Sequence, residues 1–179
     1  MSPLHHIRIL SDGKRGHENQ SLGLAEALRL HTQAEIETIT FGAKDGLLSR
    51  LCQATAAGPI PQLIVAAGHS THLPLLWAAK RFNIPSILLM KPTLPIALFD
   101  LCIIPRHDLR GHAAPSNVIP TLGMLNRLPP ELPTKEDSGL ILLGGPSKHH
   151  GWEPDPLLKD ISNICNTANN NNNNTTNNN

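Results

Sequence analysis

The chain has 179 residues, of which 40% are hydrophobic, 16% charged and 3% aromatic, so it can bury one sizeable core but not two full-sized ones. Its 15 Lys and Arg against 14 Asp and Glu give a formal net charge of +1, which excludes the strongly basic field of a nucleic-acid-binding domain. We therefore expect one domain plus a fragment, and no nucleic-acid partner.

The cysteine spacing and the hydropathy pattern indicate where in the cell the protein lies. Cys52, Cys102 and Cys165 lie far apart in no metal-ligand spacing, which is typical of isolated thiols in a reducing cytoplasm. The longest apolar run, residues 94–104, contains Pro95 and Asp100 and is shorter than the roughly 20 residues that span a bilayer. The N-terminus has no signal-peptide pattern. We expect a cytoplasmic protein, with peripheral contact at the inner face of a membrane at most.

Short apolar runs alternate with amphipathic stretches over most of the chain, which is the pattern of βαβ units. Apolar residues at helical spacing predict helices over residues 19–30, 46–55 and 71–82. The intervening runs predict strands at residues 7–10, 36–41, 63–67, 86–90, 101–104, 117–119 and 140–143. The sequence thus predicts an α/β fold, with a Rossmann-like parallel sheet flanked by helices.

The composition changes toward the C-terminus. After a first domain over residues 1–120, residues 121–138 contain three prolines and no sustained period, which is typical of a linker. Residues 139–165 then begin with a fresh strand and a glycine turn, so we expect the first βα unit of a truncated second Rossmann-like domain. Residues 166–179 are almost wholly Asn and Thr, which predicts a disordered tail.

A polar, glycine-containing loop follows the first predicted strand. Two glycines let the backbone approach a ligand, two basic residues add positive charge, and the following helix N-terminus favours an anion. The Gly13-x-x-Gly16 spacing matches neither GxGxxG nor a P-loop, so no NAD or other cofactor is expected. An ordinary solvated turn stays open as the alternative. The loop reads Ser11-Asp12-Gly13-Lys14-Arg15-Gly16-His17-Glu18-Asn19-Gln20.

A second loop, Gly68-His69-Ser70-Thr71-His72, joins another strand to a helix. It approaches the GxSxG nucleophile elbow of hydrolases, but His72 replaces the second glycine, so we predict that Ser70 or Thr71 caps the helix instead.

Two further loops, at Lys91 and at His107-Asp108, also follow apolar strands. His107 is a candidate general base oriented by a carboxylate. The histidines occur in no HExxH-like pair, so we expect no metal.

Taken together, these motifs resemble the mitochondrial fission Elm-type family, found in plants and bacteria and also described as predicted nucleoside-diphosphate-sugar epimerases. The resemblance runs from about residue 9 to residue 152. Its most specific stretch reads Asp12-Gly13-Lys14-Arg15-Gly16-His17-x-Asn19-Gln20-x-x-Gly23-Leu24-Ala25-Glu26-Ala27-Leu28. Supporting motifs are Ala67-Gly68-His69-x-Thr71, Leu89-Met90-x-Pro92, Phe99-Asp100-Leu101, Pro105-x-His107-Asp108, Asn117-Val118-Ile119-x-Thr121-x-Gly123, Leu125-Asn126-Arg127 and Gly144-Gly145-Pro146.

That family is similar to GT-B glycosyltransferases, such as the lipid-linked N-acetylglucosaminyltransferase of cell-wall synthesis. The resemblance implies an N-terminal acceptor domain, a C-terminal nucleotide-sugar domain and a cleft between them. His17 or His107 would deprotonate an acceptor hydroxyl, and Gly144 and Gly145 would begin the donor-phosphate loop. The second domain departs from the family pattern by stopping near Cys165, so we expect an incomplete form whose catalysis is in doubt.

The predicted site combines the loops and the family motifs. Its catalytic residues are His17, His107 and Asp108. Its ligand-binding residues, for a nucleotide-sugar or a phosphorylated or lipid-linked acceptor, are Asp12, Gly13, Lys14, Arg15, Gly16, Asn19, Gln20, Gly68, His69, Thr71, Lys91, Gly144 and Gly145.

Two alternatives to a glycosyltransferase-like enzyme stay open. The family name suggests a non-enzymatic scaffold at a membrane surface, with residues 94–99 as an exposed apolar patch, although a buried segment is the simpler interpretation of that run. The family description suggests an NAD-dependent nucleotide-sugar epimerase, although the first loop lacks the dinucleotide pattern. The sequence does not decide the oligomeric state.

Overall fold

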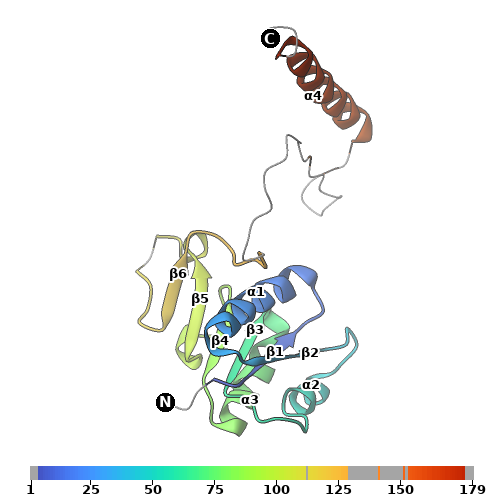
Figure 1. The fold of residues 1–179 in the computed structure, drawn as a ribbon. Coiled ribbons are helices and arrows are strands. Elements are labelled where there is room, and N and C mark those ends of the chain that lie inside the picture. The colour runs from blue at the N-terminus through green and yellow to red at the C-terminus, as the bar shows by residue number, and fades with distance from the viewer. Residues whose placement is uncertain (1–3, 112, 129–140, 142–150, 152, 176–179) are drawn as a thin grey trace. The chain divides into compact units, whose positions relative to one another are not determined.

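The computed structural model describes residues 4–111, 113–128, 141, 151 and 153–175. Six parallel strands form a single sheet in the order β2-β1-β3-β4-β5-β6 (Figure 1). The inner strands β3, β4 and β5 coincide with short apolar runs, as buried parallel strands require, whereas the edge strand β2 alternates apolar and polar residues. Their bounds are β1 His6–Ser11, β2 Glu35–Thr40, β3 Leu63–Ala67, β4 Ser86–Leu89, β5 Leu101–Pro105 and β6 Val118–Thr121. The α/β class and the Rossmann-like parallel sheet predicted from the sequence are confirmed.

Helices cover both faces of this sheet. Three α-helices connect the first four strands: α1 (Arg15–Thr32), α2 (Leu47–Ala54) and α3 (His72–Phe82). Short 3-10 turns follow β3, β4 and β5: η1 (His69–Thr71), η2 (Ile96–Leu98) and η3 (Arg106–Leu109). Helix α1 starts four residues earlier than predicted because the Lys14 carbonyl accepts the N–H groups of His17 and Glu18. The loop after β1 is therefore shorter than the sequence suggested.

The pleat of the strands divides the core into two layers. Ile7 and Ile9 of β1 pack with Ala25 of α1 on one face of the sheet. Leu10 of β1 packs on the other face, in the layer that contains Leu75 of α3 and residues of α2. Successive strand residues point to opposite faces, so β1 supplies apolar side chains to both layers.

Arg8 of β1 is charged and buried, and its side chain is fully inaccessible to solvent. Its Nε donates to Glu37 Oε2 at 2.8 Å, and its Nη1 donates to the Ala54 carbonyl at 3.2 Å. The guanidinium also lies 5.5 Å from the centroid of the Phe82 ring. These partners satisfy the charge, so Arg8 is part of the scaffold that joins β1, β2, α2 and α3.

The chain divides into two compact units, Met1–Leu132 and Pro133–Asn179. In the second unit the structure describes one helix, α4 (Pro154–Thr175). Helix α4 includes residues 166–175, within the stretch for which the sequence predicts a disordered tail; the predicted domain and tail bounds stay predictions. Pro154 starts the helix favourably, and neither glycine nor proline interrupts the Asn-rich stretch, whose helix propensity is only modestly poor. The predicted strand 140–143 and its glycine turn lie outside the described residues, apart from residue 141.

Candidate functional site

Loops that follow β1, β3 and β4 meet at one edge of the sheet, because the carboxyl ends of parallel strands lie on the same side. Strand β1 lies between β2 and β3, and the helices that follow β1 and β3 cover opposite faces of the sheet. This reversal is the topological switch point at which open α/β sheets bind ligands. The predicted loops at Asp12 and Gly68 lie directly there.

Asp12 and His17 form a hydrogen-bonded dyad at this edge. His17 Nδ1 lies 3.0 Å from each carboxylate oxygen of Asp12, and the two side chains are 18% and 5% exposed. A carboxylate only accepts, so Nδ1 donates and Nε2 of the neutral ring is left as an acceptor. The Lys14 backbone N–H also donates to Asp12, at 3.2 Å. The dyad thus presents an oriented imidazole that can accept a proton.

Gly68 has no side chain, and the dyad occupies the space that a side chain would fill. Its φ of +93° lies in the region that favours glycine, and an added Cβ would lie 2.5 Å from His17 Nδ1 and 2.8 Å from Asp12 Oδ2. A side chain at this position would displace one partner of the hydrogen bond. The loop after β3 therefore helps to determine the arrangement of the loop after β1.

A cavity of about 260 Å³ opens beside the dyad. Its charged lining residues, Lys14 and Lys91, are both basic, and no Asp or Glu is among the described residues that line it. Lys14 Nζ lies 3.8 Å from Asp12, and Lys91 Nζ donates to the Asp108 carbonyl at 3.0 Å. The lining residues are Lys14, His17, Gly68, His69, His72, Leu89, Met90, Lys91 and Thr93. This lining suits an anionic ligand.

His72 forms a buried part of the cavity wall. It is 3% exposed, its Nδ1 lies 3.3 Å from Thr93 Oγ1, and Phe99 meets its ring edge-on with centroids 5.7 Å apart. Burial, together with the nearby His69, lowers the pKa of His72 below its ordinary value. The ring is therefore held in its neutral form at physiological pH.

The other predicted residues of the first loop divide into exposed and structural positions. Arg15, Gly16 and Asn19 are exposed at the start of α1, and Gly13 adopts a φ of +77° in the turn. Gln20 is buried and its amide donates to the Gly16 carbonyl at 3.3 Å. These five residues do not line the cavity, and their predicted ligand contacts stay predictions.

The loop after β3 differs from the capping prediction. Thr71 Oγ1 donates to the Gly68 carbonyl at 2.7 Å, and no described side chain caps η1 or α3. The prediction that Ser70 or Thr71 caps the helix is wrong, because Thr71 is fully buried and its hydroxyl turns back toward the strand. Thr71 stabilises the glycine turn instead.

His107 and Asp108 lie in η3, after β5. His107 Nε2 is 3.7 Å from Asp108 Oδ1, and the side chains are 64% and 36% exposed. His107 is not among the described residues that line the cavity, although the Lys91 contact joins η3 to its rim. Their catalytic role stays a prediction. Gly144 and Gly145 lie outside the described residues.

The site predicted from the sequence lacks four of the lining residues, His72, Leu89, Met90 and Thr93. Met90 adopts a φ of +71°, which is uncommon for a residue with a side chain, and its sulfur accepts from Gln20 Nε2 at 3.4 Å. Position was the signal that could have found them, since Leu89 ends β4 and the other three residues follow strands at the same sheet edge.

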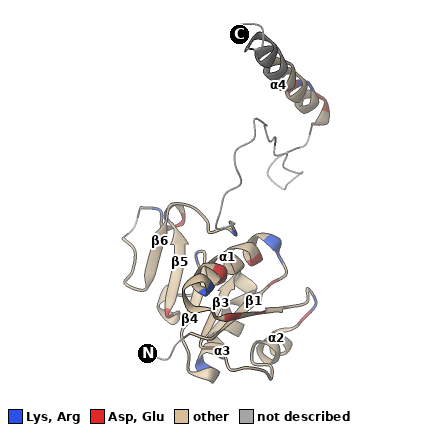
Figure 2. Ribbon diagram, in the orientation of Figure 1, with Lys and Arg blue, Asp and Glu red and all other residues tan. Residues whose placement is uncertain are grey.

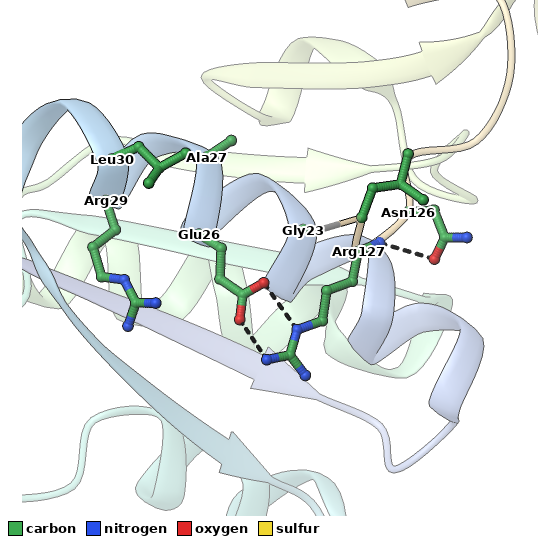
Figure 3. Close-up of a pocket in the computed structure, with 8 residues that line it drawn as sticks. Gly23, Glu26, Ala27, Arg29, Leu30, Asn126 and Arg127 are labelled. Carbon is green, nitrogen blue, oxygen red and sulfur yellow. Dashed lines mark hydrogen bonds and ion pairs between the residues drawn. The ribbon is translucent and has the colours of Figure 1, made fainter. Parts of the chain in front are cut away.

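A larger cavity, of about 630 Å³, lies between α1 and residues 126–128 (Figure 3). Its carboxylate, Glu26, is bound by the Arg127 guanidinium through contacts of 2.9 and 2.7 Å. The described lining contains no histidine, cysteine or hydroxyl side chain. The cavity beside the dyad, although smaller, is therefore the one whose lining contains side chains suited to proton transfer.

The model of the family described as Mitochondrial fission ELM1 matches residues 15–176. The chain belongs to the mitochondrial fission ELM1 family. "Uncharacterized protein RP120" of Rickettsia prowazekii (strain Madrid E) is 26% identical to this ELM1-family chain over 126 residues, which cover 63% of the chain and 36% of that relative. The match therefore spans well under two thirds of the relative's length. No solved structure matches the chain significantly.

The residues that the family model matches include most of the candidate site. His17, Gly68 and Lys91 of the ELM1-family chain lie within the matched residues. Asp12 lies outside them, because the match begins at Arg15. Among the described residues, no helix is long and apolar enough to cross a bilayer. The part of the chain that the structure describes also contains no cluster of three potential metal-ligating side chains.

Proposed function

We propose that this chain is the acceptor-binding half of a glycosyltransferase-like enzyme of the GT-B type. The observation that carries the proposal is the Asp12–His17 dyad at the switch point, beside a cavity whose charged lining is basic. A sugar acceptor needs a base for its hydroxyl group, and a phosphorylated acceptor needs positive charge nearby. The cavity supplies both.

His17 acts as the base. The carboxylate of Asp12 holds Nδ1–H, so Nε2 takes the proton of the acceptor hydroxyl as its oxygen attacks the anomeric carbon of the donor sugar. The Asp12 charge stabilises the imidazolium that forms. The bond from the anomeric carbon to the nucleotide diphosphate breaks, and that diphosphate leaves with the electron pair.

Lys14 and Lys91 hold the phosphate group of the acceptor. Both residues line the cavity, Lys14 from the loop after β1 and Lys91 from the loop after β4, and the N-terminus of α1 adds the partial positive charge of its free N–H groups. The Asp12 carboxylate, 3.8 Å from Lys14 Nζ, offsets one of the two positive charges and leaves the other. A dianion is favoured over a neutral sugar.

The test is ligand binding to the full chain. We expect N-acetylglucosamine 1-phosphate to raise the melting temperature, by up to several degrees at about 100 times its Kd. Lys14→Gln with Lys91→Gln should weaken binding about tenfold or more. Lys44→Gln, an exposed lysine outside the cavity, should leave it unchanged.

His17→Gln separates binding from chemistry. Because its proposed role is proton transfer, this variant should bind the phosphorylated sugar within about threefold of the parent chain. A response to NAD and none to phosphorylated sugars would contradict the proposal and favour the epimerase. No response to any of these ligands would favour the scaffold.

A further inference from the structure

One continuous stretch of this chain carries no acidic residue. Residues 46–99 contain no Asp or Glu, whereas Arg50, Lys80, Arg81 and Lys91 are basic. This stretch includes the whole of α2 and α3. In Figure 2 these two helices show no acidic colour, whereas α1 carries both signs.

The same helices expose large apolar side chains. Leu73 and Trp77 lie one turn apart on α3 and are 47% and 49% exposed, and Leu48 of α2 is 78% exposed. Residues four apart share one face of a helix, so Leu73 and Trp77 form a stripe that points away from the core. Leu47 and Leu98 are also about half exposed, at 48% and 55%.

These residues lie on neighbouring elements that cover one face of the sheet. Helices α2 and α3 pack against each other on the same face of the sheet. Leu98 of η2 and Lys80 of α3 line a shared hollow of about 310 Å³. We call Leu48, Leu73, Trp77, Leu98, Lys80 and Arg81 the α2–α3 surface. It combines an apolar centre with basic residues in the last turn of α3.

The carboxylates nearest in sequence to this surface are already engaged. Asp45 accepts from the Gly42 backbone at 2.7 Å and from Gln53 at 2.8 Å. Asp100, beside Leu98 and Lys80 in the hollow, accepts from the Ser86 backbone and hydroxyl at 2.9 and 2.7 Å. Among the described residues neither Lys80 nor Arg81 forms an ion pair with a carboxylate, so both can attract an external anion.

We propose that the α2–α3 surface docks the protein on a lipid bilayer rich in anionic headgroups. Tryptophan prefers the boundary between headgroups and acyl chains, leucines insert beside it, and basic residues meet the anionic phosphates. The absence of acidic residues over residues 46–99 favours an anionic lipid plane over a protein partner of mixed charge. This proposal rests on residues outside the cavity and is independent of the proposed acceptor chemistry.

The docking residues differ from those that the sequence suggested. The sequence leaves residues 94–99 open as an exposed apolar patch, with a buried segment as the simpler interpretation, and Phe99 is 3% exposed and belongs to the core. Leu94 and Ile96 pack against that core as well. Of this run, Leu98 contributes an exposed large apolar side chain.

The test is co-sedimentation of the full chain with vesicles. We expect binding to phosphatidylcholine vesicles that contain about 30% phosphatidylglycerol, weak binding to pure phosphatidylcholine, and release at about 0.5 M salt. Leu73→Ser with Trp77→Ser should lower partitioning about tenfold or more. Lys80→Gln with Arg81→Gln should lower it less and reduce its salt dependence.

Controls keep the test independent of folding and of the cavity. Leu30→Ser removes a 68% exposed leucine from α1 and should bind vesicles like the parent chain, as should His17→Gln. In a Trp152→Phe background, Trp77 is the remaining tryptophan, and its emission should shift to the blue on binding. Absence of anionic-vesicle binding, or equal binding by the Leu73 and Trp77 variant with an unchanged melting temperature, would overturn the proposal. Dimerisation abolished by that variant would instead assign the surface to a second copy.

Discussion

Gly23 of α1 lies directly against the backbone of Asn126, in the segment that leaves β6. A Cβ at Gly23 would lie 2.5 Å from the Asn126 carbonyl oxygen and 2.8 Å from its carbon. Leu125 packs into the core layer beneath α1, and Arg127 binds Glu26 one turn further along the helix. Two motifs more than a hundred residues apart, Gly23-x-x-Glu26 and Leu125-Asn126-Arg127, therefore act together. They anchor the end of the first unit to α1.

Gly23→Ala should destabilise this anchor. The new methyl group meets backbone atoms that cannot rotate away, so residues 125–127 must shift, at a cost of about 1–3 kcal/mol. Gly16→Ala is the matched control in the same helix, because no described atom lies within 4 Å of its Cβ position. It should be neutral or stabilising by up to about 1 kcal/mol. Urea unfolding of both variants checks this, and equal stability of the two would refute the anchor.

Removing the Glu26–Arg127 pair should have a smaller effect. The Arg127 side chain is 55% exposed, so water and salt screen the interaction even though Glu26 raises the pKa of Arg127. Glu26→Gln and Arg127→Gln should each lower the melting temperature less than Gly23→Ala does. In a double-mutant cycle the coupling should fall as salt rises. Coupling that does not depend on salt would show that packing, not charge, joins the segment to α1.

The inner strands β3, β4 and β5 were predictable because each is a short apolar run between polar loops. Residues 63–67 are the clearest case, where the predicted and observed strand coincide. The start of α1 was not predictable in the same way, because its first turn contains Gly16, His17 and Glu18 rather than apolar residues. Helical periodicity becomes visible only from Leu22 onward.

The candidate site was predictable as a location but not as a set of contacts. Strand order places the loops of Asp12 and Gly68 at one edge, and the polar content of those loops indicated ligand binding. The histidine-carboxylate pairing predicted from adjacency was His107 with Asp108, whereas the close hydrogen bond joins His17 to Asp12. The first turn of α1 folds His17 back over Asp12, and Gly68 leaves room for both. Neither effect can be read from residue types alone.

Gly68→Ala should disrupt the dyad. The added Cβ conflicts with both His17 and Asp12, and the φ of +93° strains any residue that has a side chain. We expect a loss of about 1–3 kcal/mol in the free energy of unfolding and a changed His17 ring environment in NMR spectra. Gly111→Ala is the control, because its φ of +77° is also left-handed but no described atom lies within 4 Å of its Cβ position. An unaltered His17 resonance in the Gly68 variant would contradict the packing.

Stability should fall on acidification because of His72. Burial lowers its pKa below the ordinary value of 6.5 in the folded protein, so the unfolded chain binds more protons between the folded pKa and 6.5. The His72 contribution is therefore fully present above about pH 6.5 and is lost as the pH falls toward the folded pKa. His72→Gln should flatten this part of the stability profile, measured by urea unfolding at successive pH values. A variant profile lowered equally at every pH would mean that His72 contributes packing alone, without the proton linkage that its buried position against Thr93 and Phe99 predicts.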